Sequence, residues 1–176
     1  PSSLWFHCLH SKQNDDELIY EEKNPGYFLN ISETLSKKYL TLSIGDHETN
    51  ELYLLDKDDN EGNLFLFCKR KKGIEYSIDH DLEKSRFIIM NNNDKAIDFK
   101  ISYIEEKRKQ PGHEKYPKKN WKDLIPHKKG ILITDFADLQ KFLIIQELKD
   151  GLPRIKFINK KTNDNRKKFK RSIKNF

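Results

Sequence analysis

The feature of this sequence that most constrains its fold is an alternation of apolar and polar side chains with a period of two. In residues 39–44, Leu40, Leu42 and Ile44 fall on one side of an extended chain, and residues 99–103 and 155–157 alternate in the same way. A strand places successive side chains on opposite faces, so this pattern predicts half-buried strands. Other short runs are apolar on both faces and predict strands buried between two sheets: residues 52–55, 64–68, 87–90, 131–133 and 142–145.

Turn-forming residues divide the chain into about thirteen such strands, and no long amphipathic helix is indicated, so the sequence predicts an all-β protein. Three segments that begin alike, residues 27–31, 75–79 and 131–135, each follow a glycine-containing turn and lead into further strands. Four strands in about 40–50 residues is the spacing of β-propeller blades. A β-sandwich or barrel with the same number of strands is the alternative. Residues 107–119, which lengthen the second repeat, are expected to form an exposed loop.

The composition permits a packed domain and divides the chain into two parts of different charge. Leu, Ile and Phe number 19, 18 and 11, which is 48 of 176 residues and enough for a core. The net charge is +6, but residues 160–176 carry eight Lys and Arg against one Asp, 8 − 1 = +7, which leaves −1 for residues 1–159. We expect a folded body over residues 1–159, with no charge-based reason to bind nucleic acid or membrane. Residues 160–176 are expected to be an irregular basic tail, or a divergent strand and loop.

The same features bear on location. No apolar run approaches the ~20 residues that cross a bilayer, and the first ten residues lack the pattern of a signal peptide. Two cysteines, Cys8 and Cys68, do not make a disulfide framework and suit a reducing compartment. We therefore expect a cytoplasmic domain. Met90 is the only methionine, which indicates that the chain is trimmed or is part of a longer protein.

Two groups of residues resemble metal ligands without completing a site. Asp56, Asp58 and Asn60 match the first positions of a calcium loop, but Glu61 stands where glycine is needed and Phe67 where a bidentate glutamate is needed. A solvated hairpin turn is the better interpretation. The other group is His7, Cys8 and His10, which on a strand would place only two ligands on one face, so we expect ordinary strand residues there.

Two further groups of residues have the chemistry for catalysis or for anion binding. Asp79, His80 and Asp81 could form a base and its orienting acid, but neighbours on a strand point to opposite sides, which favours a structural role in a turn. The basic residues 69–72 are expected to form a solvated loop. Nucleotide-binding and hydrolase glycine motifs are absent from the sequence. We therefore assign no catalytic, cofactor-binding or metal site and expect no cofactor.

Five segments in order resemble the propeller of oligopeptidase B (protease II), a group within the prolyl oligopeptidase family. They are residues 16–23, 51–56, 75–80, 121–126 and 142–152, and together they cover about residues 4–159. The resemblance implies a seven-bladed propeller joined to an α/β-hydrolase domain with a Ser-Asp-His triad. It also implies cleavage of short peptides after Lys or Arg, with the propeller excluding folded proteins.

The resemblance implies about three of seven four-stranded antiparallel blades, without the hydrolase domain and its catalytic residues. We expect a non-catalytic fragment that limits peptide access in an intact enzyme and has no activity alone. Its expected partner is a separately encoded remainder of the peptidase, or a second copy. The alternative from another class is a free-standing β-rich interaction module whose basic tail binds RNA or another protein.

Overall fold

The computed structural model describes residues 2–59, 62–107 and 114–161, and these residues are built almost wholly of β-strands. Two single-turn 3-10 helices, η1 (Gln13–Asp15) and η2 (Lys118–Asn120), are the only helices among them, so the prediction of an all-β protein is confirmed. The strands are β1 (Ser2–Phe6), β2 (Glu17–Glu22), β3 (Phe28–Glu33), β4 (Tyr39–Gly45), β5 (Asn50–Asp56), β6 (Leu64–Cys68), β7 (Tyr76–Asp81), β8 (Arg86–Asn91), β9 (Lys100–Glu105), β10 (Lys122–Ile125), β11 (Ile131–Asp138), β12 (Phe142–Lys149) and β13 (Leu152–Asn159).

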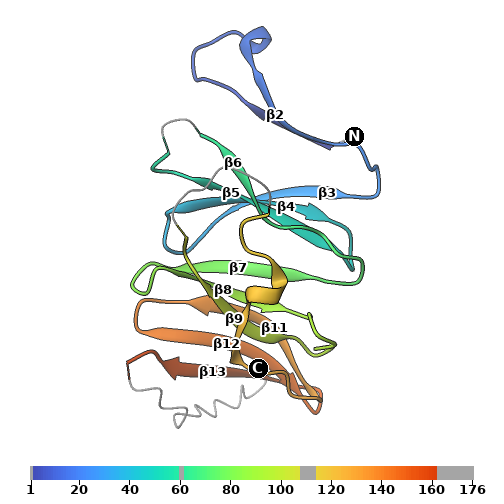
Figure 1. The fold of residues 1–176 in the computed structure, drawn as a ribbon, viewed down its shortest axis with the longest axis vertical. Helices are drawn as coiled ribbons and strands as arrows, with labels where there is room; N and C mark the ends of the chain where they lie inside the picture. The colour runs from blue at the N-terminus through green and yellow to red at the C-terminus, as the bar shows by residue number, and fades with distance from the viewer. Residues whose placement is uncertain (1, 60–61, 108–113, 162–176) are drawn as a thin grey trace, which may run out of the picture.

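The strands form four antiparallel sheets that follow one another along the long axis of the molecule (Figure 1). We call them the N-terminal sheet (β1-β2), the first blade (β3-β4-β5-β6), the second blade (β7-β8-β9-β10) and the C-terminal sheet (β11-β12-β13). In each sheet the chain passes only between neighbouring strands, as in propeller blades. The chain is therefore a partial β-propeller, with two complete blades between two incomplete sheets.

The first strand of each blade lies at one edge of its sheet. These strands are β3, β7 and β11, and β11 contacts β7 across the boundary between the second blade and the C-terminal sheet. We call this side of the stack the inner edge. The turns that follow β3, β7 and β11 lie at one end of the sheets, which we call the hairpin end. The connections that lead into β7 and β11 lie at the opposite end.

The core lies between the sheets, and its largest part joins the first and second blades. Phe67, Phe87 and Tyr116 are fully buried there, with ring centroids 4.7–5.2 Å apart. Aromatic pairs at such distances add about 0.5–1.5 kcal/mol each beyond their buried area. Tyr116 falls within residues 107–119, for which we predicted an exposed loop. That prediction is wrong for Tyr116, because its ring fills this aromatic cluster; residues 108–113 lie outside the described part.

A second cluster joins the second blade to the C-terminal sheet. Ile88 and Ile101 pack there against Ile133, Leu143 and Ile145. Residues 87–90 thus contribute alternately to both clusters, which explains a run that is apolar on both faces and confirms that this strand is buried between two sheets.

The run at residues 142–145 is different because only one face of the C-terminal sheet is covered by another sheet. Leu143 and Ile145 are buried against the second blade, whereas Phe142 remains 38% exposed. The outward face of this sheet is therefore apolar, and no other sheet among the described residues covers it. Within the described residues, no helix has the length and apolar character needed to span a membrane.

Candidate functional site at the inner edge

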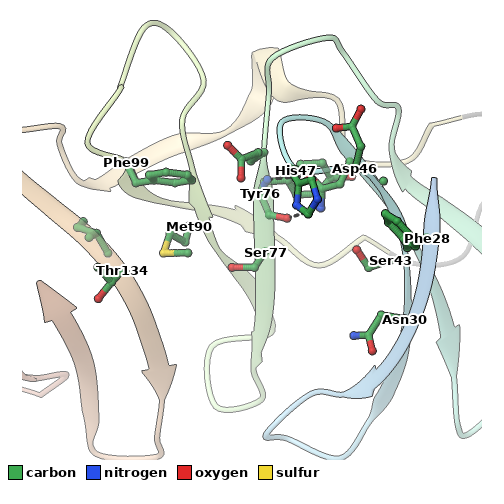
Figure 2. A pocket seen from close by; sticks show the side chains of 14 residues that line it. Phe28, Asn30, Ser43, Asp46, His47, Tyr76, Ser77, Met90, Phe99 and Thr134 are labelled. Carbon is green, nitrogen blue, oxygen red and sulfur yellow. Dashed lines mark hydrogen bonds between the residues drawn. The ribbon is translucent and has the colours of Figure 1, made fainter. Parts of the chain in front are cut away.

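A hollow of about 440 Å³ opens along the inner edge, close to where β3 and β7 begin. Figure 2 shows its walls: Asp46 and His47 of the β4–β5 turn lie on one side of β7, and Met90 and Phe99 lie on the other, with Ser77 between them. Aromatic rings and small polar groups alternate around it. Such a lining can contact both an apolar side chain and hydrogen-bonding groups of a ligand.

The rim of this hollow is acidic on the side of the first blade. Partial burial raises the pKa of Glu75, and the nearby carboxylates of Glu48 and Asp46 raise it further. Like charges disfavour ionisation because each carboxylate adds to a negative potential. The same potential attracts a cationic group that approaches the hollow.

Tyr76 ties the wall of the hollow to the first blade. Its backbone N–H donates to the Asn50 Oδ1 at 2.9 Å, and the Asn50 Nδ2 donates to the Tyr76 carbonyl at 2.7 Å. The Tyr76 hydroxyl donates to the Cys68 carbonyl at 2.6 Å and accepts from the Leu52 N–H at 3.0 Å. The ring is 3% exposed. One residue of β7 is thus bonded to both β5 and β6.

At the hairpin end, Asp79 of the second blade connects the first blade to the C-terminal sheet. Its Oδ1 accepts from the N–H of Leu35, in the turn after β3, at 2.9 Å, and from its neighbour His80 at 2.8 Å. Its Oδ2 accepts from the N–H of Asp138 in β11 at 3.3 Å. The structure therefore gives Asp79 a role in joining sheets.

The His80 ring lies on the opposite face of β7 from Asp79. Its Nδ1 lies 3.0 Å from the Ser36 hydroxyl and its Nε2 lies 3.3 Å from the Glu106 carboxylate, which also binds Lys38 at 2.5 Å. Burial lowers the pKa of His80, and Glu106 opposes this effect only in part. We predicted a role in a turn for residues 79–81; they are structural, but they are buried within β7, and the turn follows at residues 82–85.

The basic residues 69–72 do not form a uniformly solvated loop. Lys69, Lys71 and Lys72 are exposed or nearly so, but the Arg70 guanidinium pairs with Glu22 at 2.6 Å and with Glu51 at 2.8 Å. Arg70 also lies over the Tyr27 ring, 4.5 Å from its centroid. It therefore links the N-terminal sheet to the first blade. Sequence reasoning missed this role because Glu22 is 48 positions away.

The described members of the two candidate metal groups make other contacts. Asp58 donates its N–H to the Asp56 side chain at 3.1 Å, as in a hairpin turn, and Asn60 lies outside the described residues. His7 and Cys8 follow the end of β1, so our expectation of strand residues there is wrong; the His7 Nδ1 instead lies 2.6 Å from Asp16. In the described ranges, no group of three or more His, Cys, Asp and Glu side chains could hold a metal ion.

The boundary that we predicted after residue 159 also differs from the structure. The side chain of Lys160 is only 6% exposed and contacts Asp81 at 3.0 Å and Asp138 at 2.9 Å. Lys160 therefore belongs to the folded body and not to a tail. Residues 162–176, which hold the rest of the predicted basic tail, lie outside the described part of the chain.

The antiparallel sheets stack like propeller blades, and a hollow runs along their shared inner edge. This arrangement defines the class of protein: the chain is part of a β-propeller domain. The family model described as "Prolyl oligopeptidase, N-terminal beta-propeller domain" matches residues 2–174. This match extends beyond Asn159, where the resemblance found in the sequence motifs ends. The chain belongs to the prolyl oligopeptidase family and is a part of its N-terminal propeller domain.

Curated relatives agree with this assignment. Protease 2 of Moraxella lacunata is 34% identical over 101 residues, which cover 57% of this chain and 14% of the relative. Dipeptidyl aminopeptidase BI of Pseudoxanthomonas mexicana is 23% identical over 152 residues, which cover 86% of this chain and 20% of the relative. The chain thus spans a fifth or less of the length of these relatives.

Solved structures show the same fold. Oligopeptidase B from Leishmania major superposes with a TM-score of 0.77 at 23% identity, over 93% of this chain and 22% of that one. Oligopeptidase B from Trypanosoma brucei, in a closed form with covalently bound antipain, gives a TM-score of 0.76 at 24% identity, again over 93% and 22%.

Proposed function

We propose that this chain is the non-catalytic propeller part of an oligopeptidase B-like serine peptidase of the cytoplasm. In the intact enzyme its blades limit the access of peptides to a hydrolase domain that lies outside this chain, and that domain cleaves short peptides after Lys or Arg. The observation that carries the proposal is the family match over residues 2–174, supported by the 34% identity to Protease 2 of Moraxella lacunata.

The charges at the inner edge support a preference for cationic peptides. Glu75, Glu48 and Asp46 place negative charge beside the hollow, where a Lys or Arg side chain passing the blades would be attracted. Asp79 and Asp81 make no such contribution, because both are buried in contacts between sheets. The hollow itself has room for one side chain or a short stretch of peptide.

The outward face of the C-terminal sheet supports the proposal of a partner. On β12, Phe142 and Leu148 are 38% and 37% exposed, and on β13 Ile155, opposite Gln146, is 53% exposed. In the second blade, the corresponding face is covered by the C-terminal sheet through Ile88 and Ile101. We propose that the next blade of the same propeller, from the remainder of the peptidase, covers the outward face in the same way.

The test is reconstitution with the remainder of the peptidase, supplied from the adjoining coding sequence. We expect no hydrolysis of a fluorogenic dipeptide ending in Arg by this chain alone, since acyl transfer needs an activated nucleophile and an oxyanion site. With the remainder present, we expect turnover that a serine-directed inhibitor blocks. The reconstituted enzyme should cleave the dipeptide but spare the same Arg site within a folded protein.

Variants of this chain separate the gating role from mere assembly. Replacing Tyr76 by Phe should loosen the junction of the two complete blades and raise cleavage of the folded protein relative to the dipeptide. Tyr103→Phe, in the same blade, serves as the matched control. Reconstituted activity with an unchanged ratio of folded protein to dipeptide cleaved would contradict the gating role, and a failure of the wild-type chain and the remainder to associate would contradict the partner.

A further inference from the structure

Two buried carboxyl groups from two sheets meet at Lys160 at the hairpin end, and a third buried carboxyl group, that of Asp79, lies beside them. Asp79 and Asp81 come from β7, and Asp138 ends β11. The side chains of Asp81 and Asp138 are 1% and 2% exposed. The Lys160 Nζ contacts both of them, at 3.0 and 2.9 Å, and Arg86 contacts Asp81 at 3.2 Å. We call these five residues the Lys160 cluster.

The Lys160 cluster holds more acidic groups than cations. Three carboxyl groups face two positive side chains, so full ionisation leaves one negative charge uncompensated in a dry site, which is costly. Asp79 accepts hydrogen bonds from three backbone N–H groups, although burial still raises its pKa, and Asp81 is paired with both cations.

Asp138 is the least compensated of the three carboxyl groups. Its Oδ2 binds Lys160, but its Oδ1 is buried and has no hydrogen-bond partner in the described structure. A buried carboxylate oxygen without a donor is the place where a proton relieves the excess charge.

The pKa shifts of these carboxyl groups agree with their geometry. Burial, together with the charges of Asp81 and Asp79, raises the pKa of Asp138 to about 6, although Lys160 opposes the shift. Burial acts in the same direction on Asp81, but Lys160 and Arg86 outweigh it and hold the pKa of Asp81 below its usual value. The two carboxyl groups on Lys160 therefore differ in the pH at which they ionise.

We propose that the contact between the second blade and the C-terminal sheet is a proton-operated latch, closed when Asp138 carries a proton and loosened when it does not. When Asp138 is ionised, exposing its buried Oδ1 to water stabilises the charge. A movement of the turn at residues 139–141 would expose this oxygen. That movement gives up the hydrogen bond from the Asp138 N–H to Asp79 and the bridge through Lys160.

The direction of the pH effect follows from the protons bound in each state. In the closed state the pKa of Asp138 is about 6, whereas in the open state its pKa has the ordinary value of about 3.9. The closed state therefore binds more protons between these values and is weakened as the pH rises through them. Between pH 5 and 7 the opening constant should rise about tenfold.

His80 has the opposite effect on stability as the pH rises, so its contribution must be separated from that of Asp138. Its pKa is lowered by burial beside Glu106 and Lys38, at the junction of the first and second blades. The closed state of that junction therefore becomes more stable as the pH rises. Global unfolding mixes the two contributions, so the test must be local to β11 and β12.

Hydrogen exchange of the full chain provides that local test. Exchange of residues 136–145 is followed from pH 5 to 7, corrected for the intrinsic rate, in the wild type and in Asp138→Asn. We expect the tenfold rise in the wild type and a flat profile in the variant. Asp135→Asn, an exposed carboxyl group in the same strand, should behave as the wild type. A flat wild-type profile, or the same rise in Asp138→Asn, would overturn the proposal.

A second measurement needs no variant. In the carbon-13 spectrum of the wild-type protein, the carboxyl signal assigned to Asp138 should titrate with an apparent pKa above 5 while the protein stays folded. If this signal titrates below pH 5, Asp138 is ionised in the closed state and the latch does not exist.

Discussion

Replacing Tyr76 by Phe removes one oxygen atom, and we expect a large loss of stability from it. The pairing of β5 with β6 shifts register between Leu52 and Tyr53, and the Tyr76 hydroxyl lies there, bonded to the Leu52 N–H and the Cys68 carbonyl. The hydroxyl thus completes a strand ladder in the neighbouring blade. Without it, two buried backbone groups lose a partner.

The magnitude follows from that geometry. A buried donor or acceptor left unsatisfied costs about 1–3 kcal/mol. Two such groups predict a loss of about 2–6 kcal/mol in the free energy of unfolding, a large part of the ~5–15 kcal/mol that holds a domain folded. The ring itself is retained, so the aromatic packing of Tyr76 against Trp121, with centroids 5.2 Å apart, should survive.

Urea unfolding of the full chain measures this loss. Far-UV circular dichroism reports the whole chain, and tryptophan fluorescence adds a probe beside the mutated site. The midpoint should fall without a change of slope. Tyr103→Phe is the matched control: its ring lies over Arg86, and its change should stay within about 0.5 kcal/mol. A Tyr76→Phe variant as stable as this control would refute the reasoning that the hydroxyl satisfies both backbone groups.

Three further predictions rest on single contacts. Arg70→Met should lower the free energy of unfolding by about 3–5 kcal/mol because it leaves Glu22 and Glu51 without their cation, whereas Lys71→Met should have little effect in the same urea titration. A thiol reagent should label one cysteine in the native chain and two after denaturation, since Cys8 is exposed while Cys68 is buried with its pKa raised to about 11; two fast labels in the native state would contradict this burial. Lys160→Met should lower the melting temperature because Asp81 and Asp138 lose their shared cation, whereas Lys161→Met, at an exposed position, should preserve it; equal melting temperatures would count against that contact.

The arrangement of strands was predictable because strand alternation and turn residues are local signals. The run at residues 87–90 identifies a strand buried on both faces, and the repeated starts at residues 27, 75 and 131 identify the blades. Family resemblance then distinguished a propeller from a sandwich, which periodicity alone left open.

The contacts between sheets were not predictable in the same way. Asp79 bonds to residues 44 and 59 positions away, and Arg70 reaches back 48 positions. No local pattern marks such partners, since any exposed acidic or basic residue looks the same in sequence. The burial of Tyr116 within a charged segment, and of Lys160 at the start of a basic one, was hidden for the same reason.

Side chains occupy some of the backbone groups at the inner edge of β7, which has a consequence for the proposed passage of peptides. An extended peptide adds to a sheet by pairing with a row of free N–H and C=O groups. On β7, Asn50 occupies both groups of Tyr76, and the Asp79 carboxylate occupies the N–H of His80. These bonds shorten the row of free groups on which a passing peptide could form a further strand. In the proposed enzyme, a peptide that passes these positions is therefore not held there by strand pairing.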